Sequence, residues 1–213
     1  MKEEFRILST TAILGYGFPV ASFEEGMKRR PHLIAVDAGS SDPGPYYLGA
    51  GVSFTDRGSV KRDLSIMLAA AVEHSIPVVI GTAGGSGADA HLEWCMEIVR
   101  EIAREQNLHF PLARISAEVP RETVLAALRA GRVSPLGPAP ELTEEALMET
   151  TRVVGQMGLE PIQRALEGGA QVVVAGRAYD PSVFAALPVL KGYDRGLAIY
   201  LGKILECAAI AAT

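Results

Sequence analysis

Cysteine is scarce in this sequence, and its cysteines are not spaced as a redox or zinc motif. Only Cys95 and Cys207 occur among 213 residues, and both lie in apolar patterns of helical type. No C-x-x-C, H-E-x-x-H or G-x-S-x-G motif is present, which excludes the usual signatures of thiol-redox proteins, zinc proteases and α/β-hydrolases. Two reduced core thiols are typical of a cytoplasmic protein, and this is the location that we expect.

Positive charge and long apolar runs are also in short supply. The 20 Lys and Arg residues face 25 Asp and Glu residues, which makes the formal net charge −5. Nucleic-acid binding usually requires a basic face, so we expect no nucleic-acid partner. Because no apolar run of about 18 residues and no signal-peptide pattern occurs, we expect neither a membrane span nor secretion.

What the sequence does contain is an alternation of strand-like apolar runs with helical patterns. Strands are expected within residues 5–14 and at 32–36, 78–80, 110–115 and 171–175. Helices are expected from Ser22, with Glu25 completing a capping box, and at residues 60–75, 92–106, 120–130, 143–157, 160–167 and 194–212. This order predicts one α/β domain over residues 1–213, with a mostly parallel open sheet and helices on both faces in a three-layer, Rossmann-like arrangement.

The last predicted helix has no stop signal. Residues 197–213 are apolar, no Gly, Asn or Pro marks the end, and the final seven residues are uncharged. We therefore expect the domain to be truncated before a C-terminal segment, with a further protein segment or subunit covering this helix. The alternative is that the helix is central to the core and simply ends there.

Three predicted loops combine clustered glycines with acidic or basic side chains. They begin at Asp37, Gly81 and Gly176, where the second, third and fifth predicted strands end. Because the carboxyl ends of parallel strands lie along one edge of a sheet, we expect these loops to converge there. Open α/β sheets bind their ligands at that edge, so the sequence predicts a ligand site formed by these loops.

The second of these loops suggests an anion site. Gly84, Gly85, Ser86 and Gly87 lead into a helix, whose start offers closely spaced N–H groups and the positive end of a helix dipole to a phosphate or carboxylate. The G-x-G-x-x-G fingerprint and the Walker lysine are both missing. A tight turn without ligand binding is the alternative, and the default role of Asp89, also a candidate ligand-binding residue, is that of helix cap.

Carboxylates and a guanidinium supply the candidate chemistry. Asp37 and Asp42 could bind a divalent cation, share a proton or accept ligand hydroxyls, although Asp42 also fits a rigid turn. Arg177 suits bidentate recognition of a carboxylate or phosphate, with an internal ion pair to Asp180 or Asp37 as the alternative. His91, beside the glycine loop, is either an acid–base group or a packing residue.

These same segments, residues 37–49, 81–89 and 176–180, resemble the acyclic terpene utilisation AtuA family, and the chain is similar to its N-terminal part. The block Asp-Ala-Gly-Ser-Ser-Asp-Pro-Gly-Pro at residues 37–45 is the most specific element. The resemblance implies a role in bacterial catabolism of acyclic terpenes or other branched acids, whose intermediates are carboxylates or their CoA thioesters. It supplies no catalytic residues.

Together these features predict an enzyme or enzyme subunit acting on a small anionic ligand, a branched or unsaturated carboxylic acid or its CoA thioester. Hydration, elimination or a related acid–base step would use Asp37 and Asp180 to move a proton or orient a metal-bound water, while Arg177 and the glycine loop hold anionic groups. The candidate cofactors are a divalent cation and a CoA thioester, and no metal ligands are assigned. The alternative is a non-catalytic binding or scaffolding subunit whose glycine loops pack against a partner domain.

Overall fold

The computed structural model describes residues 4–211, which contain a sheet of five parallel strands. The strands are β1 (Ile7–Ser9), β2 (Leu33–Gly39), β3 (Val78–Gly85), β4 (Leu112–Ile115) and β5 (Val172–Ala175). Their order across the sheet is β1-β2-β3-β5-β4, and every pairing is parallel. The chain therefore crosses over the sheet between successive strands, as the alternating pattern predicts.

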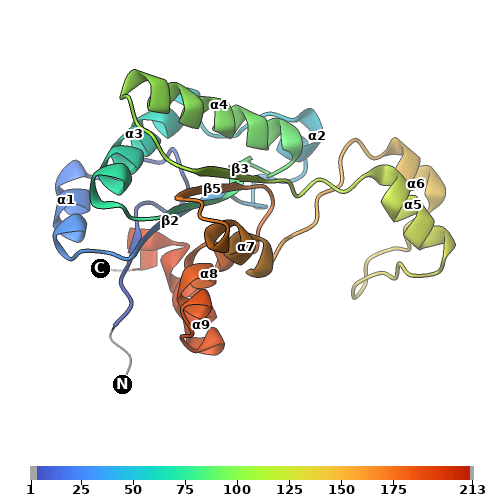
Figure 1. The fold of residues 1–213 in the computed structure, drawn as a ribbon. Coiled ribbons are helices and arrows are strands. Elements are labelled where there is room, and N and C mark those ends of the chain that lie inside the picture. The colour runs from blue at the N-terminus through green and yellow to red at the C-terminus, as the bar shows by residue number, and fades with distance from the viewer. Residues whose placement is uncertain (1–3, 212–213) are drawn as a thin grey trace.

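Helices cover both faces of this sheet (Figure 1). The described helices are α1 (Val20–Lys28), α2 (Tyr46–Ala50), α3 (Arg57–His74), α4 (Asp89–Glu105), α5 (Arg121–Arg129), α6 (Glu144–Glu149), α7 (Glu160–Glu167), α8 (Ser182–Leu190), α9 (Arg195–Leu205) and a 3-10 turn at Ala208–Ala211. Helices α1, α3 and α4 pack on one face, and α7, α8 and α9 pack on the other. The expected three-layer α/β fold is confirmed.

Strand β2 shows why the strands read as continuous apolar runs. All seven of its residues are buried. Ile34 and Val36 enter the core beneath α1, α3 and α4, whereas Leu33 and Ala35 enter the core beneath α7 and α8. A strand that is covered on both faces loses the alternation of apolar and polar residues.

Helices α5 and α6 lie to one side of the sheet rather than on either face (Figure 1). Glu144 of α6 accepts two hydrogen bonds from Arg129 of α5, at 2.9 and 2.7 Å.

Within the described residues, no helix is both long and apolar enough to cross a bilayer.

The expected capping box at the first helix is wrong. Helix α1 begins at Val20 after Pro19, so Ser22 lies inside the helix, and no side chain caps its start. Glu25 instead forms an ion pair with Lys28 at 3.0 Å. The φ of −66° at Pro19 lies close to the value that the proline ring imposes, which allows the helix to begin directly after it.

Several other predicted boundaries are corrected. Helix α8 was not expected, because residues 182–188 are all buried and such a helix shows no amphipathic period. The sequence predicts a loop where α2 forms, and the helix expected at residues 143–157 is confined to Glu144–Glu149. The final predicted helix ends at Leu205 and is followed by the 3-10 turn, while its expected last residue, Ala212, lies outside the described residues.

Two strands also run further than predicted. Strand β2 continues through Asp37 to Gly39, and β3 continues through Gly81 to Gly85. Asp37 pairs with Gly81, and the register shifts before Gly39 pairs with Gly85. The first residues of both expected loops are therefore strand residues, which fixes their backbone more firmly than a loop would.

Candidate functional site

The carboxyl edge of the sheet holds Asp37 in a defined position. Its side chain is buried in β2, and its Oδ1 accepts the N–H of Gly39 at 3.2 Å. The backbone carbonyl of Asp37 accepts the N–H of Leu14 at 2.9 Å, so the loop after β1 lies beside it. Main-chain contacts on both sides thus hold this carboxyl at the end of the sheet.

The segment after β5 is bound to β3 at the same edge. The N–H of Thr82 donates to the carbonyl of Gly176 at 3.0 Å. The N–H of Ala178 donates to the Thr82 hydroxyl at 3.2 Å, and that hydroxyl lies 3.3 Å from the Ala178 carbonyl. These bonds place Arg177 and Asp180 on the edge that carries Asp37.

The charges at this edge act on one another. Burial raises the pKa of Asp37 well above the ordinary value for aspartate, and the neighbouring carboxylate of Asp180 raises it further. The hydrogen bond from Gly39 and the charge of Arg177 lower this pKa without offsetting the increase. Asp37 therefore keeps its proton at a pH where an exposed aspartate is ionised, and it can act as an acid.

Arg177 has a fixed main chain and makes no ion pair with the aspartates near it. Among the contacts described for residues 4–211, its guanidinium forms no ion pair with Asp37 or Asp180, although its charge acts on Asp37. Its main chain is fixed, because the N–H of Arg177 donates to the carbonyl of Gly87 at 3.0 Å. A positioned backbone with an unengaged guanidinium suits the recognition of a carboxylate.

The glycine segment is tightly packed against other parts of the chain. Gly84, Gly85 and Gly87 have φ values of +65°, +96° and +75°. A Cβ on Gly84 would lie 2.6 Å from the His91 carbonyl, and one on Gly85 would lie 2.7 Å from the Phe54 ring. Each position thus requires glycine on packing grounds, and anion binding by this segment stays a prediction.

The start of α4 differs from the expected cap. Ala88 is the N-cap, and Asp89 is the first residue of the helix and makes no capping bond. The N–H of Asp89 donates to the Glu118 carboxylate at 2.8 Å, while the Asp89 carboxylate accepts the Ser116 hydroxyl at 2.5 Å. A carboxylate of the chain itself therefore occupies the positive end of this helix, where acidic groups are stabilised.

Asp42 lies in an exposed turn. Its N–H donates to the Ser40 hydroxyl at 3.1 Å, and the turn closes with a bond from the Gly44 N–H to the Ser41 carbonyl at 3.0 Å. Helix α2 begins shortly after this turn. The geometry is that of a rigid turn, and ligand binding by the Asp42 carboxylate stays a prediction.

His91 fastens the α2 segment to the first turn of α4. The residue is buried, and its Nε2 lies 3.0 Å from the Tyr47 carbonyl and 3.2 Å from the Val52 carbonyl. Two carbonyl partners require a proton on Nε2, which leaves Nδ1 as the unprotonated nitrogen. Burial lowers the pKa of His91, so the ring is neutral at pH 7 and its described contacts are structural.

We expect His91→Ala to lower the free energy of unfolding by about 1–3 kcal/mol at pH 7, since two buried carbonyls lose their donor. The lowered pKa of His91 also means that the unfolded chain gains a proton before the folded one, so wild-type stability should fall as the pH drops below about 6.5. Urea unfolding between pH 5 and 8 measures both effects. The exposed His109→Ala is the control. If His91→Ala kept the wild-type dependence of unfolding free energy on pH, the structural role of His91 would be contradicted.

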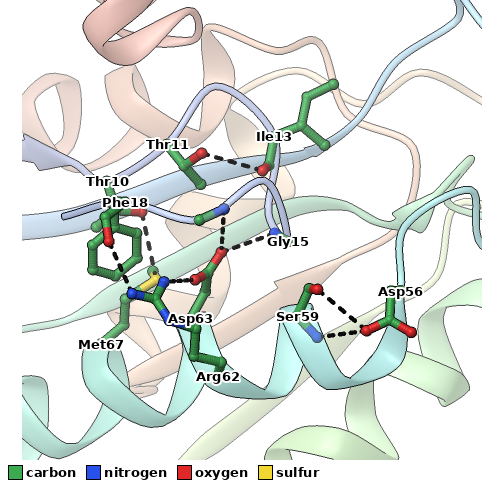
Figure 2. A network of polar contacts seen from close by, with 11 residues as sticks. Thr10, Thr11, Ile13, Gly15, Phe18, Asp56, Ser59, Arg62, Asp63 and Met67 are labelled. Atoms are coloured by element: carbon green, nitrogen blue, oxygen red, sulfur yellow. Dashed lines mark hydrogen bonds and ion pairs between the residues drawn. The ribbon is translucent and has the colours of Figure 1, made fainter. Parts of the chain in front are cut away.

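Asp63 is a structural residue that the sequence reasoning missed. It is fully buried in α3 and accepts the N–H groups of Gly15 and Gly17, each at 3.1 Å, and the Arg62 guanidinium at 2.7 Å (Figure 2). It thereby holds the loop after β1, which bonds to Asp37 through Leu14. The available signal was an aspartate inside an otherwise apolar helical stripe.

Glu206 was also missed. It follows α9, is 9% exposed, and contributes to the raised pKa of Asp37. Its signal was a lone glutamate in the apolar final helix.

Among residues 4–211, no group of three or more His, Cys, Asp or Glu side chains is arranged to hold a metal ion, so we assign no metal ligands.

Comparison with known protein families bears on the identity of the chain. The profile described as Acyclic terpene utilisation family protein AtuA matches residues 57–212. The chain belongs to this AtuA family. The part that matches the AtuA profile starts at α3 and includes the glycine segment, Arg177, Asp180 and Glu206, whereas Asp37 precedes it. Neither a curated protein nor a solved structure matches the chain.

Proposed function

We propose that this AtuA-family chain binds a branched or unsaturated carboxylic acid, or its CoA thioester, at the carboxyl edge of the sheet and performs acid–base chemistry on it. The observation that carries the proposal is the buried Asp37 carboxyl, whose pKa is raised by burial and by Asp180 beside the charge of Arg177. A neutral acid, a second carboxylate and a cation are the groups that hydration or elimination requires. Membership of a terpene-utilisation family favours branched acids as the substrate class.

The proposed roles follow from the charges. In elimination, Asp180 takes a proton from the carbon next to the carboxyl carbon, the C–O bond to the hydroxyl breaks, and Asp37 gives its proton to the departing hydroxyl. The products are water and a carbon–carbon double bond, and proton transfer from Asp180 to Asp37 restores the site. Hydration is the reverse. Arg177 binds the carboxylate or the thioester carbonyl, and the glycine segment lies beside it through Gly87.

The direct test is ligand binding with and without Arg177. Branched acids and their CoA thioesters should raise the melting temperature of the wild-type chain, since a ligand of the native state stabilises it. Arg177→Ala should weaken binding by about 10- to 100-fold, the loss expected for charge-assisted hydrogen bonds. The exposed Arg132→Ala is the matched control, and equal affinities of the two variants would overturn the proposal.

A non-catalytic binding subunit is the second candidate, and one surface favours it. Leu197, Tyr200, Leu201 and Ile204 are exposed on α9 at the spacing of a single helix face. The glycines at residues 81–85 are buried within the chain, so a partner would meet α9 rather than the glycine loop. That another segment or subunit covers α9 stays a prediction, as does a cytoplasmic location.

A further inference from the structure

Unpartnered polar atoms occur on residues at the proposed site. Within the described part of the chain, four buried side-chain atoms have no hydrogen-bond partner, and they are His91 Nδ1, Asp180 Oδ1, Ser182 Oγ and Glu206 Oε2. Such atoms are few in folded proteins, because a buried polar atom without a partner loses its hydrogen bonds to water and gains none in return. Asp180 and Ser182 are two residues apart, and both flank Pro181. A ligand that offers them hydrogen bonds would therefore be stabilised at this turn.

Helix α9 brings Glu206 to the same place. A Cβ on Gly202 would lie 2.6 Å from the carbonyl oxygen of Pro181, so the helix approaches the 180–182 turn as closely as a glycine allows. Glu206 follows Gly202 by four residues, and its N–H donates to the Gly202 carbonyl at 2.9 Å. Residues four apart share a helix face, so Glu206 lies on the side of α9 that faces this turn.

The Glu206 side chain is held through one carboxylate oxygen, and its other oxygen has no hydrogen-bond partner. Its Oε1 accepts the Lys203 ammonium at 2.5 Å, and the end of α9 is tied to β1 by a bond from the Ser9 hydroxyl to the Leu205 carbonyl at 2.7 Å. The residue is 9% exposed, and its charge acts on Asp37. Glu206 Oε2 is therefore a fixed, buried acceptor near the proposed acid.

The unpartnered atoms define what a ligand must offer. The free oxygens of Asp180 and Glu206 accept hydrogen bonds, the Ser182 hydroxyl both donates and accepts, and Arg177 only donates. A ligand that satisfies them needs a hydroxyl close to a carboxylate. Resting on the proposed function, we infer that the site binds a hydroxycarboxylic acid. Its hydroxyl donates to Glu206 Oε2 and accepts from Ser182 Oγ, its carboxylate binds Arg177, and Asp180 stays free to act on the neighbouring carbon.

A matched pair of ligands tests this inference. In 3-hydroxy-3-methylbutanoate and 3,3-dimethylbutanoate a hydroxyl replaces a methyl group at constant shape, and both are titrated calorimetrically as free acids and as CoA thioesters. Wild type should bind the hydroxy compound at least about tenfold more tightly, because a site built to bond a hydroxyl rejects an analogue that lacks one. Glu206→Gln should reduce this preference to about threefold or less and leave the affinity for the dimethyl compound unchanged.

The controls separate the two proposals. Glu160→Gln removes an exposed, ion-paired carboxylate and should leave the preference intact. If Glu206→Gln lowers the melting temperature strongly, Ser182→Ala provides the same test. If wild type bound both compounds equally and Arg177→Ala bound neither, the hydroxy-acid inference would be overturned and the proposed function would stand. No binding of either compound, as acid or thioester, would overturn both.

Discussion

Asp37→Asn is expected to lower the turnover of a branched 3-hydroxyacyl-CoA or enoyl-CoA by about 10²- to 10⁴-fold, the usual contribution of a positioned acid or base. Asparagine has nearly the same shape and can still accept the Gly39 N–H through Oδ1, so the fold and the binding of substrate should be retained. It has no proton to give to a departing hydroxyl. Steady-state kinetics should therefore show a fall in kcat with little change in KM.

The pH dependence adds a second readout for Asp37. Its pKa is raised by burial first and then by Asp180, so activity that needs the protonated form should extend above the pH at which an ordinary aspartate ionises and decline as the pH rises through the raised pKa. Stability should already decline as the pH rises from the ordinary aspartate pKa of about 3.9 towards that raised pKa, because ionising the buried carboxyl costs about 1.4 kcal/mol for each unit of pKa shift. Asp37→Asn should lose both dependences.

The exposed Glu149→Gln is the control for these measurements, since its carboxyl lies at the end of α6, away from the proposed site. It should keep wild-type turnover and the wild-type pH profiles. Full activity in Asp37→Asn would remove Asp37 from the mechanism. A loss of stability on lowering the pH through the Asp37 titration would contradict the buried, protonated carboxyl.

Gly87→Ala is expected to lower the free energy of unfolding by about 3 kcal/mol or more. The loss has two causes, backbone strain at a positive φ and a steric clash of the new Cβ. The φ of Gly87 is +75°, and an added Cβ would lie 2.6 Å from the Cα of Arg177. The neighbour is main chain that bonds Gly87 in return, so it cannot rotate away. Urea unfolding monitored by circular dichroism measures the loss.

Gly137→Ala separates the two contributions. Its φ is +60°, and nothing lies within 4 Å of an added Cβ, so only the backbone term of about 1–2 kcal/mol should appear. Equal losses in the two variants would mean that the approach of Gly87 to Arg177 does not matter for stability. Ligand binding by refolded Gly87→Ala should also weaken, because Arg177 would be displaced.

Prediction from sequence succeeded where the evidence was local. The apolar runs at residues 78–80 and 171–175 and the helical period of α4 reported buried strands and a one-sided helix, since burial imposes those patterns directly. Prediction failed where contacts with residues distant in the sequence determine the local structure. Asp89 has the composition of a cap, yet Glu118 reaches its N–H, and α8 is hidden because burial on all sides removes its period.

By itself the sequence determined that strands and helices alternate in a parallel α/β fold and that Asp37 and Arg177 lie towards the carboxyl ends of buried strands, because hydrophobic period and turn composition are properties of short segments. Only the tertiary structure decided the order β1-β2-β3-β5-β4, which sets β3 between the strands that lead to Asp37 and Arg177. It alone also brought Glu206 of the final helix to Asp180. Such contacts depend on packing between residues far apart in the chain, and no local pattern records that packing.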